Sequence, residues 1–218
     1  MKDVERIEEI DRRLKESYPR AHIVLVYETD FQLLVAVILS AQTTDITVNK
    51  VTGALFKKYP TPEAIAGADL EEFERDIKPT GFYHNKARNV MGAAWMIVAE
   101  FGGRVPDTME DLIKLPGVAR KTANIVLYNA YGISDGIAVD THVKRLSQRL
   151  GFSANNDPEK IERDLMKLFP REEWGTLTYR LIDHGRAICD AKRPICGACA
   201  LAELCPSAFK VKGWRENA

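Results

Sequence analysis

Hydrophobic residues recur every three or four positions along most of the chain, the spacing that places side chains on one face of an α-helix. Near the N-terminus, Val4, Ile7, Ile10 and Leu14 form such a face. Six further segments combine this spacing with a capping residue or a polar turn: 45–59, 69–77, 85–101, 107–115, 140–151 and 157–169. No convincing run of alternating strand residues interrupts them, so the pattern predicts an all-α fold.

The connections between these segments are short and rich in proline, glycine and asparagine, as in YPTP, KPTG, FGGRVPD and SANNDP. Such connections predict helices that pack into a compact body. The stretch from Gly132 to Gly136 is the expected seam between two lobes. We therefore expect one helical domain over 22–133 and a second formed by 1–21 together with 134–218.

Composition is that of an ordinary soluble protein, with 218 residues of which 45% are hydrophobic. The most apolar stretch, FQLLVAVILSA, is too short to span a bilayer, and the charged N-terminus lacks the apolar segment of a secretory signal. We therefore expect a cytoplasmic protein without a membrane partner. A monomer is expected as well, because no heptad pattern or self-complementary patch indicates otherwise.

Charge is unevenly distributed although the formal net charge is zero: between Lys114 and Leu150, six Lys or Arg stand against two Asp. Within this basic region lies LPGVARKTA, residues 115–123. Gly117 can adopt positive φ and lets a backbone or a phosphate approach without a Cβ in the way. The local excess of positive charge suits an anion site better than a protein that coats a polyanion.

Lys121 is expected near the start of the helix that follows this turn, where free N–H groups and the helix dipole attract anions. That position disfavours an ammonium ion. A lysine held there and partly shielded from water should lose its proton readily and act as a nucleophile. The alternative interpretation is a joint between two helices with a solvated basic pair.

Four cysteines lie within seventeen residues, spaced C-x6-C-x2-C-x5-C: Cys189, Cys196, Cys199 and Cys205. Without a secretory segment a disulfide framework is out of place, whereas four thiolates from one loop form a complete set of metal ligands. Such sites hold zinc or an iron–sulfur cluster, and the spacing alone leaves that choice open. Unligated thiols are the less favoured alternative.

The segments LPGVARKTANIVL and VDTHVKRLSQRLG, followed by the four-cysteine tail, together resemble the endonuclease III family of DNA base-excision glycosylases. The likeness runs from LLVAVILSAQTTD to Cys205, most of the chain. It implies an all-α helix–hairpin–helix DNA glycosylase fold of two helical lobes, the first carrying the hairpin and the second a C-terminal [4Fe–4S] loop. The resemblance therefore favours iron over zinc.

By resemblance, the chain is a bifunctional DNA glycosylase and apurinic/apyrimidinic lyase that excises oxidised or damaged pyrimidines in base-excision repair. Its partner would be double-stranded DNA with damaged bases or abasic sites, and in a prokaryote it would associate with the nucleoid. One alternative is a mismatch-specific glycosylase acting on adenine or thymine, although such relatives often lack the lysine. Another is a non-catalytic iron–sulfur protein that binds DNA or senses oxidation.

Two residues match the family's catalytic pair, Lys121 as nucleophile and Asp140 as carboxylate. The chemistry of the residues agrees, because a carboxylate stabilises the positive charge that builds on the sugar as an N-glycosidic bond breaks. A neutral lysine can then bond to C1′, and the Schiff base acidifies the C2′ proton, so that β-elimination cuts the strand. Capping of the helix that follows is the alternative role for Asp140.

The resemblance also implies DNA contacts. Gln42 and Phe82 match the side chains that fill the space left by an extruded base, and the hairpin grips a phosphate through Pro116, Gly117, Val118, Ala119 and Arg120. Phe82 departs from the usual leucine, and Ala119 stands where the family usually has a second glycine. Ala119 would be strained if its position needs positive φ, whereas alanine would cost little if the position needs only a small side chain beside the phosphate. The alternatives are a polar loop residue for Gln42 and a core aromatic for Phe82.

Four further residues lie in matching or neighbouring segments. Asp45 and His142 are candidate pocket residues, although Asp45 can equally cap a helix and His142 can be an ordinary first-turn residue. Lys192 and Arg193 can contact DNA phosphates, with a solvated loop as the alternative. The cluster has no evident open coordination site, so a structural role is expected for it.

Overall fold

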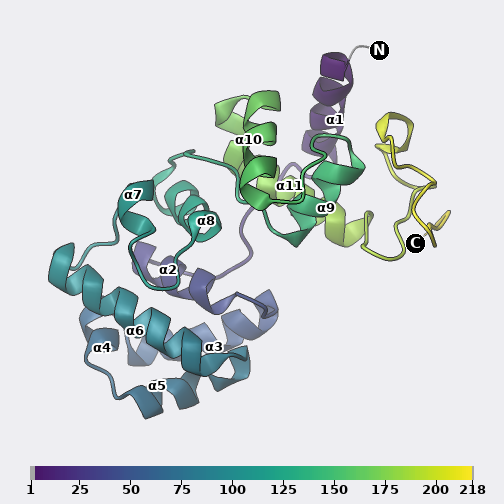
Figure 1. Cartoon of the computed structure of the whole chain (residues 1–218). Coiled ribbons are helices and arrows are strands. Elements are labelled where there is room, and N and C mark those ends of the chain that lie inside the picture. The colour runs from purple at the N-terminus through teal and green to yellow at the C-terminus, as the bar shows by residue number, and fades with distance from the viewer. Residues whose placement is uncertain (1–2, 218) are drawn as a thin grey trace. The chain divides into compact units, whose positions relative to one another are not determined.

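The computed structural model describes residues 3–217, and that range contains eleven α-helices, three short 3-10 helices and no strand (Figure 1). The all-α prediction is therefore confirmed. The α-helices are α1 (Asp3–Ser17), α2 (Asp30–Leu39), α3 (Asp45–Lys58), α4 (Pro62–Ala66), α5 (Leu70–Ile77), α6 (Tyr83–Glu100), α7 (Met109–Leu112), α8 (Arg120–Tyr131), α9 (Thr141–Arg149), α10 (Pro158–Leu168) and α11 (Trp174–Ala187). The 3-10 helices are η1 (Lys78–Thr80), η2 (Arg171–Glu173) and η3 (Ala202–Leu204). Among the described helices, none has the length and apolar character needed to cross a membrane.

The chain divides into two compact units. One spans Val24–Asp135, and the other combines the chain up to Ile23 with the chain from Gly136 onward. Each boundary lies two residues after the corresponding boundary predicted for the domains. Whether these units fold as independent domains stays a prediction.

The unit spanning Val24–Asp135 is built around α2, in which nine of the ten residues are buried. Helices α3, α6 and α8 pack against α2, while α4 and α5 pack against α6. Because α2 is apolar on every side, it has no polar face to reveal a helical period. The hydrophobic pattern for this reason does not predict α2 as a helix.

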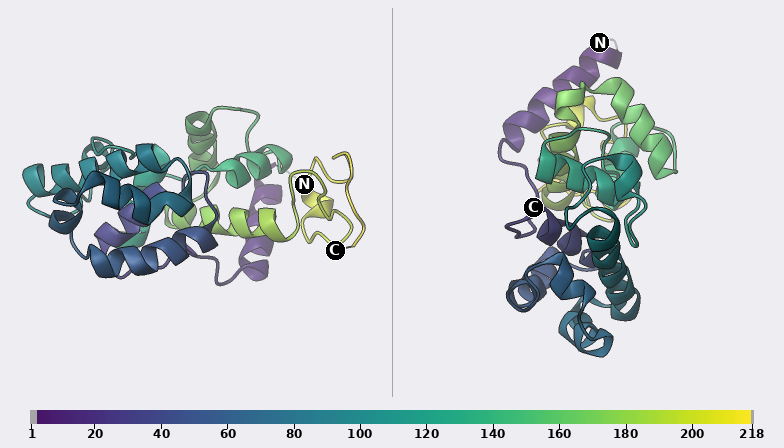
Figure 2. Two further views of the ribbon diagram at one scale, coloured as in Figure 1. Left: turned by 90° about the horizontal axis from the view of Figure 1, so that it is seen from below. Right: turned by 90° about the vertical axis from the view of Figure 1, so that its left-hand side faces the viewer.

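The other unit joins α1 to α9, α10 and α11 around one hydrophobic core. From α1, Ile7, Ile10 and Leu14 are buried in that core as expected, but Val4 is 65% exposed and does not share it. After α11 the chain is irregular except for η3, as the yellow segment in Figure 2 shows. Three of the four cysteines pack against this core from that segment.

The six predicted internal helices all form, with starts that follow their capping residues. Thr44, Asp69, Thr108, Asp140 and Asp157 each accept a backbone N–H at the start of α3, α5, α7, α9 and α10. Helix α6 instead begins at Tyr83, two residues before the predicted start. Helix α7 ends at Leu112, because the chain then turns into the hairpin. Helix α11 was not predicted, and its N-terminus lacks a side-chain cap.

Candidate functional site

The hairpin between α7 and α8 is anchored by buried Leu115 and Val118, and the Val118 N–H donates to the Leu115 carbonyl at 3.1 Å. Gly117 is exposed with φ +79°, and a Cβ there would lie 2.8 Å from the Cβ of Asn89 on α6. Glycine is thus required both by the backbone and by its neighbour. Ala119 has φ −96° and ψ 171°, so its backbone is extended and alanine is not strained there.

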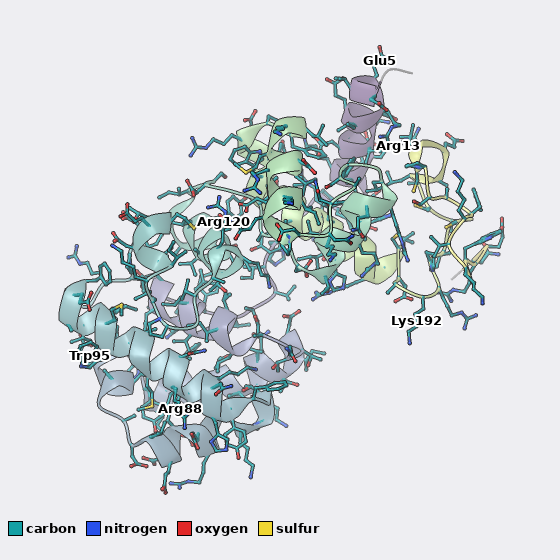
Figure 3. The ribbon with its side chains drawn as sticks, in the orientation of Figure 1. Glu5, Arg13, Arg88, Trp95, Arg120 and Lys192 are labelled. Carbon is teal, nitrogen blue, oxygen red and sulfur yellow. The ribbon has the colours of Figure 1, made fainter. Side chains whose placement is uncertain are left out.

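The N-terminus of α8 follows directly. Ala119 is its N-cap residue and supplies no side-chain hydrogen bond, so the first-turn N–H groups keep the anion-attracting character of a helix start. Arg120 opens the helix (Figure 3) and Lys121 is its second residue. The side chain of Lys121 is exposed. The partial shielding of Lys121 from water that its sequence position predicts is therefore not provided by the folded chain.

Asp140 caps α9 from an extended backbone, with φ −97° and ψ −172°. Its Oδ1 accepts the N–H groups of His142 and Val143, each at 2.8 Å, and its Oδ2 lies 3.1 Å from Nδ1 of His142. The side chain keeps 21% of its surface exposed. Capping and a chemical role are compatible here, because the cap uses Oδ1 alone and part of the side chain's surface stays exposed.

Gln42 and Phe82 lie in two loops of the Val24–Asp135 unit and share an uncommon backbone conformation. Their φ angles are +54° and +48°, in the left-handed region that non-glycine residues rarely adopt. Both side chains are exposed, Phe82 by 65%. Phe82 is therefore not a core aromatic, and that alternative is wrong. Asp45 does not cap α3, because Thr44 occupies that position, and Asp45 is the first helical residue.

Lys86 is a buried lysine that the sequence pattern does not predict. It is 5% exposed on α6, and its ammonium group donates to Leu39, Thr43 and Thr80 in and beside the loops that carry Gln42 and Phe82. No local signal could have identified it, because a lysine in a helix is usually solvated. Only the tertiary structure shows that this lysine turns inward.

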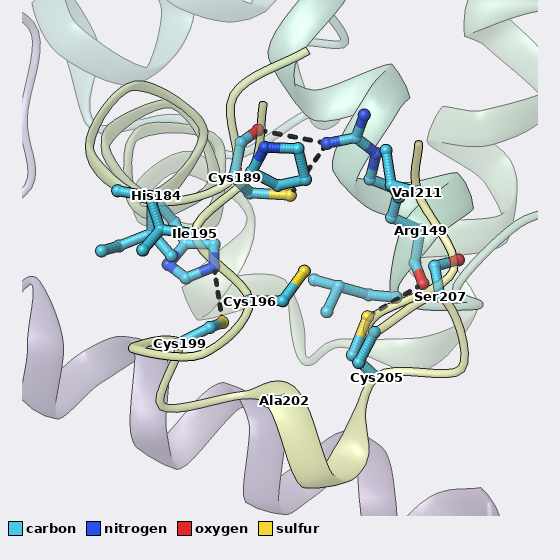
Figure 4. Close-up of a pocket in the computed structure, with 14 residues that line it drawn as sticks. Arg149, His184, Cys189, Ile195, Cys196, Cys199, Ala202, Cys205, Ser207 and Val211 are labelled. Atoms are coloured by element: carbon cyan, nitrogen blue, oxygen red, sulfur yellow. Dashed lines mark hydrogen bonds between the residues drawn. The ribbon is translucent and has the colours of Figure 1, made fainter. Parts of the chain in front are cut away.

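The four cysteines line one cavity in the unit that contains α9 and α11 (Figure 4). The cavity holds about 410 Å³ of empty space, part of it open to solvent. Arg149 donates to Sγ of Cys189 at 3.3 Å, and Nε2 of buried His184 lies 3.6 Å from Sγ of Cys199. Neither Arg149 nor His184 was identified from the sequence.

The thiols surround this space rather than converge on a point. Within residues 3–217, no three His, Cys, Asp or Glu side chains are placed to hold a single metal ion. Burial raises the pKa of the Cys199 thiol to about 11, and burial also raises the pKa of Cys205. Thiolates at these positions therefore need positive charge beside them, which iron or another metal supplies.

The loop between the first two cysteines holds Lys192 and Arg193, both exposed, with Lys192 labelled in Figure 3. Their backbone N–H groups donate to Oδ1 of Asp190, each at 2.9 Å. This turn is fixed by its backbone while the two cationic side chains extend from it. Either a DNA contact or a solvated loop fits this arrangement.

The candidate residues fall in both units. Lys121, the hairpin, Gln42, Phe82 and Asp45 belong to the Val24–Asp135 unit. Asp140, His142 and the cysteines belong to the other unit. In the Val24–Asp135 unit, α6 contacts segments that are distant in sequence. Gly117 lies against Asn89, and Lys86 bonds to the loops that carry Gln42 and Phe82.

Comparison with known proteins places these features in a family. Residues 35–171 match the family described as HhH-GPD superfamily base excision DNA repair protein. Endonuclease III of Synechocystis sp. is 57% identical over 94% of this chain and 93% of the relative, and that of Bacillus subtilis is 45% identical over 96% of each. A solved structure of a trapped covalent intermediate of endonuclease III with DNA matches with TM-score 0.92 and 44% identity, over 96% of this chain and 99% of that one.

Proposed function

Because this chain belongs to the endonuclease III family of helix–hairpin–helix base-excision repair proteins, we propose that it is a bifunctional DNA glycosylase and apurinic/apyrimidinic lyase. Its substrates are oxidised or ring-damaged pyrimidines and abasic sites in double-stranded DNA. In a prokaryotic cell it acts in the cytoplasm, at the nucleoid. The observation that carries the proposal is Lys121, an exposed lysine one residue into a helix that starts at a glycine hairpin.

The hairpin and the start of α8 hold a DNA phosphate. Ala119 is extended and gives α8 no side-chain cap, so the N-terminal end of this helix can attract an anion. A phosphate bound there positions the strand without reading its sequence. Exposure of Lys121 in the free protein then becomes useful, because the bound DNA itself supplies the shielding from water that favours a neutral amine.

Lys121 performs the covalent step. Its neutral amine bonds to C1′ as the bond from C1′ to the base nitrogen breaks, and the base leaves with a proton. The sugar ring opens to a Schiff base, C2′ loses a proton, and the electron pair expels the 3′ phosphate oxygen. The strand is thus cut by β-elimination. The carboxylate of Asp140 stabilises the positive charge that develops on the sugar as the bond to the base breaks.

Gln42 and Phe82 fill the duplex where the damaged nucleotide has left the stack. Both project from exposed loops, and a phenyl ring can stack between bases as readily as an aliphatic side chain can. This role accounts for an aromatic residue that the fold does not bury. Lys192 and Arg193 add contacts to the phosphate backbone.

The four cysteines would hold a [4Fe–4S] cluster. Four thiols around a shared space suit a cluster, whose iron atoms keep the ligands apart, better than a zinc ion that draws them to one point. The four cysteines would thereby connect four points of the otherwise irregular chain that follows α11. Analysis of the purified protein should find about four iron and four sulfide per chain. One zinc per chain without sulfide would contradict this assignment.

The test of the activity is borohydride trapping on a duplex that contains thymine glycol. Borohydride reduces a Schiff base to a stable amine, so wild-type protein should become covalently attached to DNA. Lys121→Ala should give no adduct. The matched control is Lys114→Ala, an exposed lysine of the same segment that pairs with Asp111, and it should trap as wild type does.

Absence of an adduct from wild-type protein that still binds the duplex would refute lyase action on this lesion. A mismatched duplex then distinguishes the remaining candidates. Release of adenine or thymine without trapping would indicate a mismatch-specific glycosylase. Binding without any release would indicate a non-catalytic protein.

A further inference from the structure

Lys86 lies in the first turns of α6 with its ammonium group enclosed by the protein. Nζ donates to the carbonyl of Leu39 at 2.8 Å, to Oγ1 of Thr43 at 2.7 Å and to the carbonyl of Thr80 at 2.7 Å. Thr43 in turn donates its hydroxyl to the Thr80 carbonyl. The three acceptors come from the end of α2, from the loop before α3 and from η1.

A buried ammonium with only neutral partners is expensive to maintain. An ammonium has three protons, and here all three are used on uncharged oxygens. No ion pair among residues 3–217 includes Lys86, and burial lowers its pKa. A methionine would fill a similar volume without the cost of desolvating a charge. The presence of a lysine at this position is therefore best explained by the segments that its ammonium group connects.

It connects the two loops that present Gln42 and Phe82. Gln42 is bracketed by Leu39 and Thr43, and Phe82 follows Thr80 by two residues. Both Gln42 and Phe82 have positive φ and exposed side chains, so burial of their own side chains does not offset the backbone strain. The backbone N–H of Lys86 also donates to the Phe82 carbonyl at 3.1 Å, so Lys86 is bonded directly to Phe82 as well.

We infer that Lys86 is a positioning residue that holds the Gln42 and Phe82 loops in one arrangement, so that both side chains enter the duplex together. This inference rests on the proposed function. Insertion fills the space of one nucleotide, so two side chains from separate loops must keep a fixed spacing before DNA binds. A single ammonium that bonds to both loops provides that spacing.

The same helix extends this arrangement to the hairpin. Lys86, Asn89 and Gly92 follow each other at intervals of three, which places them along one side of α6. A Cβ at Gly117 would touch Asn89, and a Cβ at Gly92 would lie 3.2 Å from Cγ of Pro116. Helix α6 thus contacts both the hairpin and, through Lys86, the loops with Gln42 and Phe82.

The experiment compares Lys86→Met with the double variant Gln42→Ala/Phe82→Ala. The probe is a duplex with a tetrahydrofuran abasic analogue beside 2-aminopurine, whose fluorescence rises when the base loses its stacking. Lys86→Met should lose most of that rise, and its preference for this duplex over an undamaged one should fall about tenfold, as in the double variant. Lys50→Met, which removes an exposed lysine of α3, should behave as wild type does.

Combining the variants distinguishes a positioning role of Lys86 from a general loss of stability. Added to Gln42→Ala/Phe82→Ala, Lys86→Met should change the preference by less than about twofold, because it acts through those two side chains. A full additional tenfold loss, or a Lys86→Met protein with wild-type fluorescence, would overturn the inference. If Lys86→Met does not fold, Thr43→Val removes one acceptor from a half-buried position and should show the same coupling.

The proposed function is measured separately in the same samples. Wild-type protein should be trapped by borohydride on a duplex with a natural abasic site. If that trapping fails, the proposed function is wrong. If trapping succeeds while Lys86→Met keeps the wild-type fluorescence and preference, only the positioning role is wrong.

Discussion

Gly117 meets two requirements at once, a backbone with φ +79° and the close approach of Asn89. Gly117→Ala should therefore destabilise the Val24–Asp135 unit by about 2–4 kcal/mol, the sum of left-handed strain and steric overlap. Gly132→Ala is the matched control, since Gly132 has φ +68° but nothing within 4 Å of an added Cβ. It should cost only the strain, about 1–2 kcal/mol. Urea unfolding measures the stability of both variants. Equal losses of unfolding free energy would show that Asn89 moves away from the added Cβ without cost.

Tyr131 makes the stability of this unit depend on alkaline pH. Its hydroxyl is half-buried, and its one proton is shared between two acceptors, Oδ2 of Asp30 at 3.0 Å and the Val105 carbonyl at 2.7 Å. Burial first, and then Asp30, raise the pKa of Tyr131 well above its usual value near 10. The unfolded chain therefore loses this proton at a lower pH than the folded chain does. The stabilisation is complete below pH 10 and declines as pH rises above about 10.

Tyr131→Phe tests this dependence. The free energy of unfolding of the wild type should decline more steeply above about pH 10 than that of the variant, which has no phenol to titrate at this position. Urea unfolding at several pH values measures the difference. Parallel curves for the two proteins would mean that Tyr131 titrates normally in the folded state.

Among the helices, α9 is capped by Asp140, the residue that is also proposed to stabilise charge during catalysis. Asp140→Asn keeps an oxygen that can accept the N–H groups of His142 and Val143 but removes the charge, so stability should change by less than about 1 kcal/mol. Base excision should fall by about 10²- to 10³-fold, because the positive charge on the sugar is no longer stabilised. Single-turnover release of thymine glycol measures this loss. If Asp140→Asn excises the base at the wild-type rate, the role of Asp140 is limited to capping α9.

Asp157→Ala provides the control for capping. Asp157 caps α10 by accepting the N–H of Lys160 at 3.0 Å, and no catalytic role is proposed for it. Its replacement should cost about 1 kcal/mol of stability and leave excision unchanged. A loss of excision here would show that the assay responds to stability.

For the whole molecule, the main question is whether the two units fold independently. The Val24–Asp135 unit is continuous in sequence and has its own buried centre in α2. Residues 24–135 expressed alone should therefore be helical and unfold cooperatively, as followed by circular dichroism in urea. A non-cooperative transition would mean that this unit needs the rest of the chain. The complementary segments are discontinuous and are not expected to fold when separated.

How much could be predicted from the sequence depended on how local each signal was. The helices with a capping residue and an apolar face were predicted to within a few residues, as for α3 and α10. Helix α2 was missed because every face is apolar, and α11 because its N-terminus lacks a side-chain cap. The family was recognised from three motifs, and the matches over most of the chain confirm it.

The sequence by itself determined the helical architecture, the family and the candidate chemistry, because caps, periodicity and motifs are read from neighbouring residues. Only the tertiary structure decided that Ala119 is unstrained, that Phe82 is exposed and that Lys86 is buried. Each of these depends on backbone angles or on contacts between segments far apart in the chain. Lys86 shows the reason most clearly, since its acceptors are up to 47 positions away in sequence and come together only when the helices pack.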